Sequence, residues 1–242
     1  MWEQIEPGRA IYRVCPAAAS ADASQSAAVP CSISADGLGG SRGLQLNCLF
    51  GPAKSGDATE IPSATFQIHT DSAKTIPELS ESYVRGEDLV LTYAQQEKDS
   101  FGLSIQATPI ECRERMTIIQ LTISMQTDLL DSHPSIELLA AAAGKAQSAP
   151  DRPAVIGPRP LSAVSGEEVY GTIILSPRDQ RAAVDSSDSD ALRVRLFGNF
   201  LEKGVIRKSQ PWIVIWRGAP PEASEIDAVY QRLCQTPLPL TT

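Results

Sequence analysis

The chain has 242 residues, of which 42% are hydrophobic and 5% aromatic, and its formal net charge is −8. This length fits one large all-β domain or two small ones. The acidic balance, with dispersed basic residues, disfavours nucleic acid and anionic membrane surfaces as partners. The N-terminal stretch lacks the pattern of a signal peptide, and no apolar run is long enough to cross a bilayer. We therefore expect a cytoplasmic protein.

The five cysteines are odd in number and widely spaced, and no two of them form a C-x-x-C pair. This spacing disfavours a zinc ribbon and a thioredoxin-type redox site. Buried free thiols in a reducing compartment are the favoured interpretation. A disulfide between Cys31 and Cys48 stays open as an alternative.

Short runs rich in β-branched residues dominate the chain and lie between turn signals, which is typical of antiparallel strands. We predict strands over residues 9–15, 43–50, 64–70, 88–94, 101–108, 115–126, 169–175, 192–200 and 212–217. The runs at 116–125 and 212–216 are apolar on both faces. Strands of that kind are covered on both sides, so stacked sheets or a sheet covered by a helix are expected.

Two segments carry helix signals. Residues 222–234 place Ile226, Val229, Tyr230 and Leu233 at helical spacing, behind two prolines, and Ser224 with Asp227 suggests a capping box. Residues 135–146 are a second, weaker candidate, in which Ser135 is the expected N-cap.

Four stretches have the composition of mobile loops: residues 16–29, 51–62, 146–160 and 181–190. The third could divide two domains, but the strands after it are apolar enough to complete the same core. The prediction is therefore a single all-β domain over 1–242, a large antiparallel sandwich with one or two peripheral helices.

Motifs of known chemistry are absent from the sequence. It has no nucleophile elbow, no phosphate-binding loop and no dinucleotide fingerprint, and its two histidines are too few for a histidine-rich metal site. His69 beside Asp71 is either an acid/base couple or a surface turn, and His133 lies in a turn before Pro134. The spacing of acidic residues at 185–190 does not complete a calcium loop. We expect no metal and no cofactor, and the lack of a catalytic motif argues against an enzyme.

The segment 192–218 concentrates charged, aromatic and glycine residues between two strongly β-forming runs. We predict a central hairpin closed at Glu202-Lys203-Gly204. Charged side chains that hydrogen-bond hydroxyls in pairs, beside aromatic rings, suit a polyol ligand. The candidate ligand-binding residues are Arg195, Glu202, Lys203, Arg207, Trp212 and Trp216. The alternative is a structural network of salt bridges at a sandwich edge.

The stretch FLEKGVIRKSQPWIVI, together with the terminal PLPLTT, resembles a conserved hypothetical bacterial family with no assigned activity. Residues 83–93, 122–132 and 199–207 carry the similarity, about a third of the chain. The long antiparallel strands also resemble the galactose-mutarotase-like supersandwich, whose members bind carbohydrate on a concave sheet. That second resemblance implies a catalytic histidine and glutamate, which the sequence alone does not place.

Three hypotheses on function follow. The first is a carbohydrate-binding or carbohydrate-related protein of the mutarotase-like type. The second is a non-catalytic structural or protein-interaction protein, in which the charged cluster is structural. An enzyme with an unrecognised acid/base pair is the third hypothesis.

Overall fold

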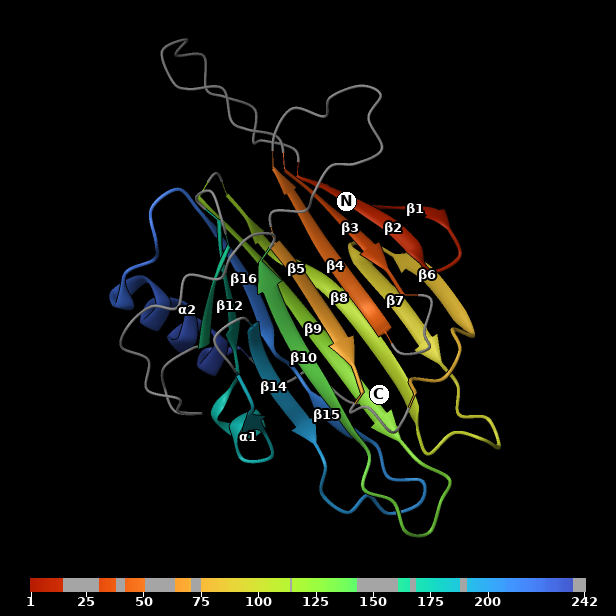
Figure 1. Ribbon diagram of the computed structural model, residues 1–242. Helices are drawn as coiled ribbons and strands as arrows, with labels where there is room; N and C mark the ends of the chain where they lie inside the picture. The colour runs from red at the N-terminus through yellow and green to blue at the C-terminus, as the bar shows by residue number, and fades with distance from the viewer. Residues whose placement is uncertain are drawn as a thin grey trace.

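The computed structural model describes residues 1–14, 31–37, 42–50, 64–70, 75–113, 115–142, 161–165, 169–187 and 191–236. These residues form two stacked antiparallel β-sheets with two helices (Figure 1). The predicted loops at 16–29, 51–62 and 146–160 lie outside the described residues. Strands from both sides of the 146–160 segment pair with one another, β10 with β14 and β9 with β16.

Sheet I contains the first five strands of the chain and three later ones. In spatial order they are β1 (Trp2–Glu6), β2 (Arg9–Val14), β3 (Cys31–Asp36), β4 (Arg42–Phe50), β5 (Ala64–His69), β10 (Ser135–Ala142), β14 (Ala191–Phe197) and β13 (Val184–Asp185).

Sheet II is built around a four-strand meander, to which the C-terminal strands add. In spatial order it contains β11 (Leu161–Ser165), β12 (Val169–Ile174), β16 (Trp212–Arg217), β9 (Met116–Gln126), β8 (Gly102–Cys112), β7 (Asp88–Tyr93) and β6 (Glu81–Arg85), and β15 (Arg207–Ser209) also pairs with β9.

The main core lies between the sheets, because alternate residues of each strand point inward. Sheet I contributes side chains such as Leu46, Phe66 and Leu138, and sheet II contributes Ile105 and Ile123, all fully or almost fully buried. At one side of the core the Tyr93 hydroxyl donates a hydrogen bond of 2.7 Å to the Gly37 carbonyl oxygen. A Cβ at Gly37 would lie 2.6 Å from Leu91 Cδ1 and 2.8 Å from the Tyr93 hydroxyl oxygen, so a larger residue would have to displace these side chains.

A second, smaller core covers the outer face of sheet II. Helix α2 (Ala223–Gln235) lays Val229, Tyr230 and Leu233 against Trp212 and Trp216 of β16. This confirms the helix predicted at 222–234. It also explains why the strands at 116–125 and 212–216 are apolar on both faces.

The capping of α2 differs from the prediction. The capping box joins Glu222 and Glu225, not Ser224 and Asp227, because the N-cap lies two residues before the expected one. The other helix, α1 (Pro177–Gln180), is a single turn capped by Ser176.

The predicted helix at 135–146 is wrong as far as the structure describes it. Residues 135–142 form β10, which pairs with β5 on one side and β14 on the other. Ile136, Leu138 and Ala140 are buried, and Glu137 and Leu139 between them are half-buried. Pairing along both edges, with a period of two, overrides the helix preference of the alanines.

The predicted central hairpin is also wrong. β14 lies in sheet I and β16 in sheet II, so the segment 192–218 crosses from one sheet to the other. The crossing begins where Phe197 and Gly198 adopt positive φ angles of 66° and 85°, which end the strand. The segment 181–190, predicted as a mobile loop, contains the two-residue strand β13 in its described part.

Candidate functional site

The two tryptophans of the predicted site are inside the protein. Trp212 and Trp216 are 2% and 3% exposed and pack beneath α2 on sheet II. Both indole N–H groups donate to neighbouring side chains, Trp212 to Gln120 Oε1 at 3.0 Å and Trp216 to Thr172 Oγ1 at 3.2 Å. Their rings are therefore closed to a ligand in this structure.

Of the charged residues of the predicted hairpin turn, Glu202 and Lys203 lie in the loop between β14 and β15, and Arg207 is the first residue of β15. Glu202 and Lys203 are exposed, and Arg207 donates a 2.6 Å hydrogen bond to the Phe200 carbonyl oxygen. Arg207 thus fastens its own loop. The structure does not bring these three residues together with the tryptophan rings.

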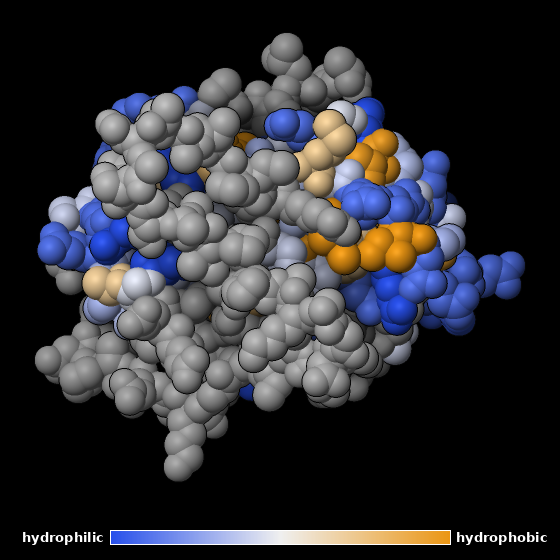
Figure 2. All heavy atoms as spheres, turned by 90° about the horizontal axis from the view of Figure 1, so that it is seen from above, coloured by the Kyte–Doolittle hydropathy of each residue, from blue (hydrophilic) through white to orange (hydrophobic). Residues whose placement is uncertain are grey.

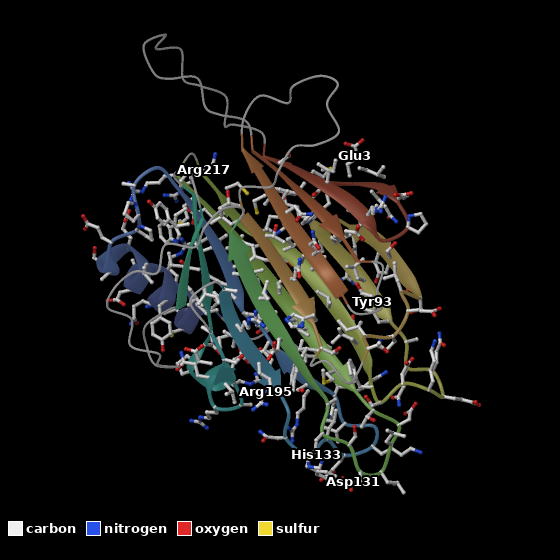
Figure 3. All side chains as sticks on the ribbon, in the orientation of Figure 1. Glu3, Tyr93, Asp131, His133, Arg195 and Arg217 are labelled. Atoms are coloured by element: carbon white, nitrogen blue, oxygen red, sulfur yellow. The ribbon has the colours of Figure 1, made fainter. Side chains whose placement is uncertain are left out.

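Arg195 lies elsewhere, on the outer face of sheet I (Figure 3). It stands directly opposite Glu137 of β10, and Glu137 stands directly opposite His69 of β5. One row across three neighbouring strands therefore carries an imidazole, a carboxylate and an exposed guanidinium. The sequence suggested that His69 pairs with Asp71 or lies in a turn. In the structure His69 is the last residue of β5 and stands opposite Glu137, and Asp71 lies outside the described residues.

The contacts of His69 indicate which ring nitrogen donates a hydrogen bond and which is an acceptor. Its Nδ1 atom lies 3.1 Å from the Thr70 carbonyl oxygen, which only accepts, so Nδ1 carries a hydrogen. The other ring nitrogen, Nε2, is buried and lies 3.4 Å from Glu137 Oε2. In the neutral ring two acceptors face each other. The contact becomes an ion pair when the ring gains a second proton.

Glu137 is held from two sides and still reaches solvent. Besides His69, its Oε1 atom receives a 3.5 Å hydrogen bond from Ser186 Oγ, just after β13. The side chain remains 18% exposed. A carboxylate has about four acceptor positions, so this one keeps capacity for a hydroxyl donor.

A ladder of amide side chains continues the same face across β5 and β4. Gln67 Nε2 donates to Gln45 Oε1 at 3.0 Å, Gln45 Nε2 donates to Asn47 Oδ1 at 2.8 Å, and Thr65 Oγ1 donates to the same oxygen at 3.1 Å. The Asn47 amide nitrogen and the Gln67 carbonyl oxygen take no part in these bonds. Among the described residues no hydrogen bond engages either group, so each can bind a hydroxyl group.

An irregularity of the sheet lies beside the row. The register between β4 and β5 shifts between Arg42 and Gln45, opposite His69 and Gln67. Bulges of this kind locally bend a strand and redirect its side chains, and they are frequent next to functional sites.

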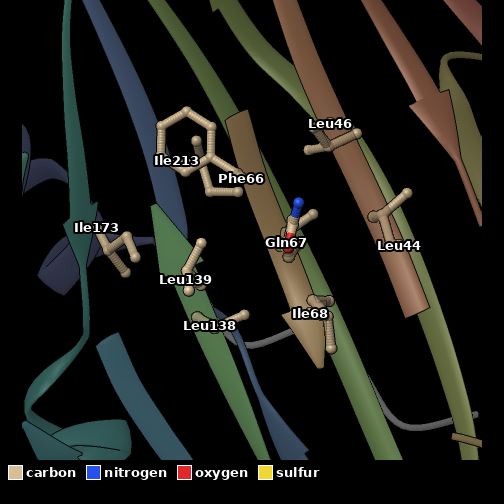
Figure 4. Close-up of a pocket in the computed structure, with 10 residues that line it drawn as sticks. Leu44, Leu46, Phe66, Gln67, Ile68, Leu138, Leu139, Ile173 and Ile213 are labelled. Carbon is tan, nitrogen blue, oxygen red and sulfur yellow. The ribbon is translucent and has the colours of Figure 1, made fainter. Parts of the chain in front are cut away.

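A small void in the core is lined mainly by apolar side chains (Figure 4). It has a volume of about 10 Å³ and lies among core side chains such as Leu46, Phe66 and Ile213. This is the space of about one water molecule. A ligand of sugar size would therefore bind on a face and not in this void.

Metal ligands do not gather in the described part of the chain, where no three His, Cys, Asp or Glu residues form a group that could hold an ion. Asp185 accepts a 2.9 Å hydrogen bond from the Ser187 backbone N–H, and Asp188 and Asp190 lie outside the described residues. Cys112 and Cys234 are free thiols, and burial raises the pKa of Cys112. Cys31 and Cys48 lie on neighbouring strands but are not opposite each other, since Cys48 stands across from Ile33.

No protein-family model and no curated protein matches this chain. The resemblances drawn from the sequence thus stay predictions. Among the described residues, the helices are too short and too polar to cross a membrane.

Sequence reasoning identified Arg195 and His69 but missed the residue between them. Glu137 fell in the segment assigned to a helix, where it has no reason to approach His69. The alternation of the apolar residues Ile136, Leu138 and Ala140 with Ser135 and Glu137 was the sequence signal that could have placed Glu137 on a strand face.

Proposed function

We propose that this protein binds a carbohydrate on the outer face of sheet I, around Glu137. The observation that carries the proposal is the cross-strand row of His69, Glu137 and Arg195 beside the amide ladder. Carboxylate, amide and guanidinium groups on one face offer acceptors and donors in alternation. That is the pattern that neighbouring hydroxyls of a sugar require.

Each group has a distinct role in this proposal. Glu137 accepts a hydrogen bond from one hydroxyl, and Arg195 across the strand pair donates to the next. His69 does not contact the ligand itself, because its buried Nε2 lies against the carboxylate and away from solvent. Asn47 and Gln67 extend recognition along the sheet. The resemblance to the mutarotase-like supersandwich, whose members bind sugars over a histidine and a glutamate, points the same way.

Recognition on this face rests on hydrogen bonds. The tryptophans that would have stacked on a sugar are buried under α2, and Phe197 at the end of β14 is 8% exposed. A site without stacking binds single sugars weakly, and we expect a dissociation constant on the order of 1 mM for a monosaccharide.

A glycan array followed by thermal-shift titration tests the proposal. At ten times the dissociation constant, a bound sugar stabilises the folded state by about 1.4 kcal/mol, which raises the melting temperature of a chain this size by roughly 3–6 °C. Glu137→Gln and Gln67→Ala should each remove most of that shift. Gln106→Ala on the outer face of β8 in sheet II is the matched control and should keep it.

The absence of any stabilising sugar would contradict the proposal. So would a sugar whose shift persists in Glu137→Gln and Gln67→Ala while both variants remain folded. In either case the structural or protein-interaction class would be favoured instead.

A further inference from the structure

Two loops lie side by side at one end of the sandwich. One joins β9 to β10 over residues 127–134, and the other joins β14 to β15 over residues 198–206. The Leu201 and Gly204 backbone N–H groups donate to the Ser132 and Thr127 carbonyl oxygens, each at 2.9 Å. His133 and Asp131, labelled in Figure 3, mark the tip of this end.

These loops expose large apolar side chains, each at least 42% exposed, and Phe200 among them contacts the His133 ring at a centroid distance of 5.7 Å. The side chains are Leu129, Leu130, Phe200, Val205 and Ile206, here called the loop-end patch. Leu130 is 81% exposed and Ile206 is 54% exposed. Figure 2 shows the opposite end, where hydrophilic and apolar side chains of the described residues both reach the surface.

The loop-end patch is held in shape by the backbone. Glu202 and Val205 close a turn with a 3.1 Å hydrogen bond, and Gly204 takes the positive φ of 77° that the turn requires. Thr127 Oγ1 donates to the Ser100 carbonyl oxygen at 2.8 Å and ties the first loop to the meander of sheet II. A surface ordered in advance loses little entropy when it is covered.

The charges around the patch differ between the two loops. The first loop carries two exposed carboxylates, Asp128 and Asp131. The second loop and the start of β15 carry three cations against the single carboxylate of Glu202, and the cations are Lys203, Arg207 and Lys208. One loop is therefore acidic and its neighbour is basic.

We infer that the loop-end patch is the contact surface for a second copy of this chain, related by a twofold axis. In a twofold contact the same surface of both copies comes together, rotated by 180°, so the acidic loop of one copy faces the basic loop of the other. Leu129 and Leu130 then cover Val205 and Ile206 of the partner copy. A membrane is disfavoured as the occupant, because Asp128 and Asp131 flank the leucines and would have to be carried toward the bilayer.

The size of the patch sets the strength of the contact. Its apolar area is roughly 300–600 Å², the size of the largest patch on an ordinary monomer. A stable interface buries about 800 Å² on each partner. We therefore expect a concentration-dependent dimer with a dissociation constant on the order of 10–100 μM.

Sedimentation velocity from about 1 μM to about 500 μM tests the inference, because it spans the expected dissociation constant. The wild-type chain should shift from monomer to dimer. Leu130→Asp and Ile206→Asp should each stay monomeric with an unchanged circular dichroism spectrum. Ile5→Asp, on a residue 62% exposed in β1, is the control and should dimerise like the wild type.

A charge exchange tests the twofold arrangement itself. Asp131→Lys and Lys203→Glu should each weaken the dimer at least tenfold, because like charges then face each other in both halves of the contact. An equimolar mixture of the two variants should restore it, since the heterodimer pairs opposite charges in both halves.

Three outcomes would overturn the inference. The first is a wild-type chain that stays monomeric throughout the range. The second is a dimer that survives Leu130→Asp and Ile206→Asp. The third is a monomer that binds vesicles of neutral phosphatidylcholine through Leu130, which would make the patch a lipid contact.

Discussion

The outer faces of the two sheets have opposite characters. On sheet II, α2 closes the face over Trp212 and Trp216, and Arg232 of the helix lies 5.9 Å from the Trp212 ring centroid. On sheet I, the row through Glu137 and the amide ladder form a polar, half-buried face. Residues that lie close together in the sequence therefore have different places: Trp212 and Trp216 are on the closed face of sheet II, and Arg195 is on the candidate binding face of sheet I.

The division follows from the crossing between β14 and β16. Arg195 precedes the positive-φ turn at Phe197 and Gly198 and stays on sheet I, whereas the tryptophans follow it and join sheet II. A single turn thus separates the residues that the sequence suggested as one site. Two predictions test whether the two faces differ as the structure implies, and two more test the core between the sheets.

The largest effect is expected on the closed face. Trp212→Ala removes a ring at the centre of the contact between α2 and sheet II and leaves a cavity, so the free energy of unfolding should fall by about 3–5 kcal/mol. Trp212→Phe should lower the free energy of unfolding by a clearly smaller amount. Urea denaturation measures both, and a loss below about 1 kcal/mol for Trp212→Ala would show that the face is not closed as described.

An intermediate effect is expected in the core that both sheets share. Tyr93→Phe deletes the donor to the Gly37 carbonyl oxygen and should lower the free energy of unfolding by about 1–1.5 kcal/mol near neutral pH. Burial raises the pKa of Tyr93 in the folded protein, with a further contribution from the charge of Asp36.

The raised pKa of Tyr93 gives the stability a pH dependence with a defined sign. Above about pH 10 the unfolded chain loses the tyrosine proton and the folded chain keeps it, so the contribution of this group to stability falls as pH rises. Between about pH 8 and pH 11, the free energy of unfolding from denaturation curves should fall less steeply with pH for Tyr93→Phe than for the wild type. The same pH dependence in both proteins would contradict a Tyr93 phenol that stays buried and protonated in the folded state.

The smallest effect on stability is expected on the open face. Glu137→Gln keeps the size of the side chain and removes a partly buried contact with His69 that is no ion pair in the neutral ring, so the free energy of unfolding should change by about 0–1 kcal/mol. Urea denaturation should therefore give nearly the wild-type free energy of unfolding. A loss as large as that of Trp212→Ala would mean that the row is structural, and the candidate site would lose its main support.

Much of the fold could be predicted because its signal is local. The strands at 116–126 and 212–217 alternate apolar residues on both faces, and the helix near 222–234 shows its period directly. β10 was missed because its alanines favour a helix when tertiary pairing is ignored. The short strands β13 and β15 carry too few residues to show a period.

The candidate site could be predicted only in part. Arg195 and His69 were singled out for their chemistry, but the register that aligns them with Glu137 depends on pairings between strands far apart in the chain. Nor does any local signal say that β14 and β16 belong to different sheets. The positive φ of Phe197, which starts the crossing, occurs in a residue type that rarely adopts it.

The most direct test of the central claim is a nitrogen–proton correlation spectrum recorded while a sugar identified on the array is titrated. Amide signals of Gln67, His69 and Glu137 on sheet I should shift with a single dissociation constant. The indole signals of Trp212 and Trp216, buried under α2, should stay in place. Shifts of those indole signals, with sheet I unchanged, would contradict the account.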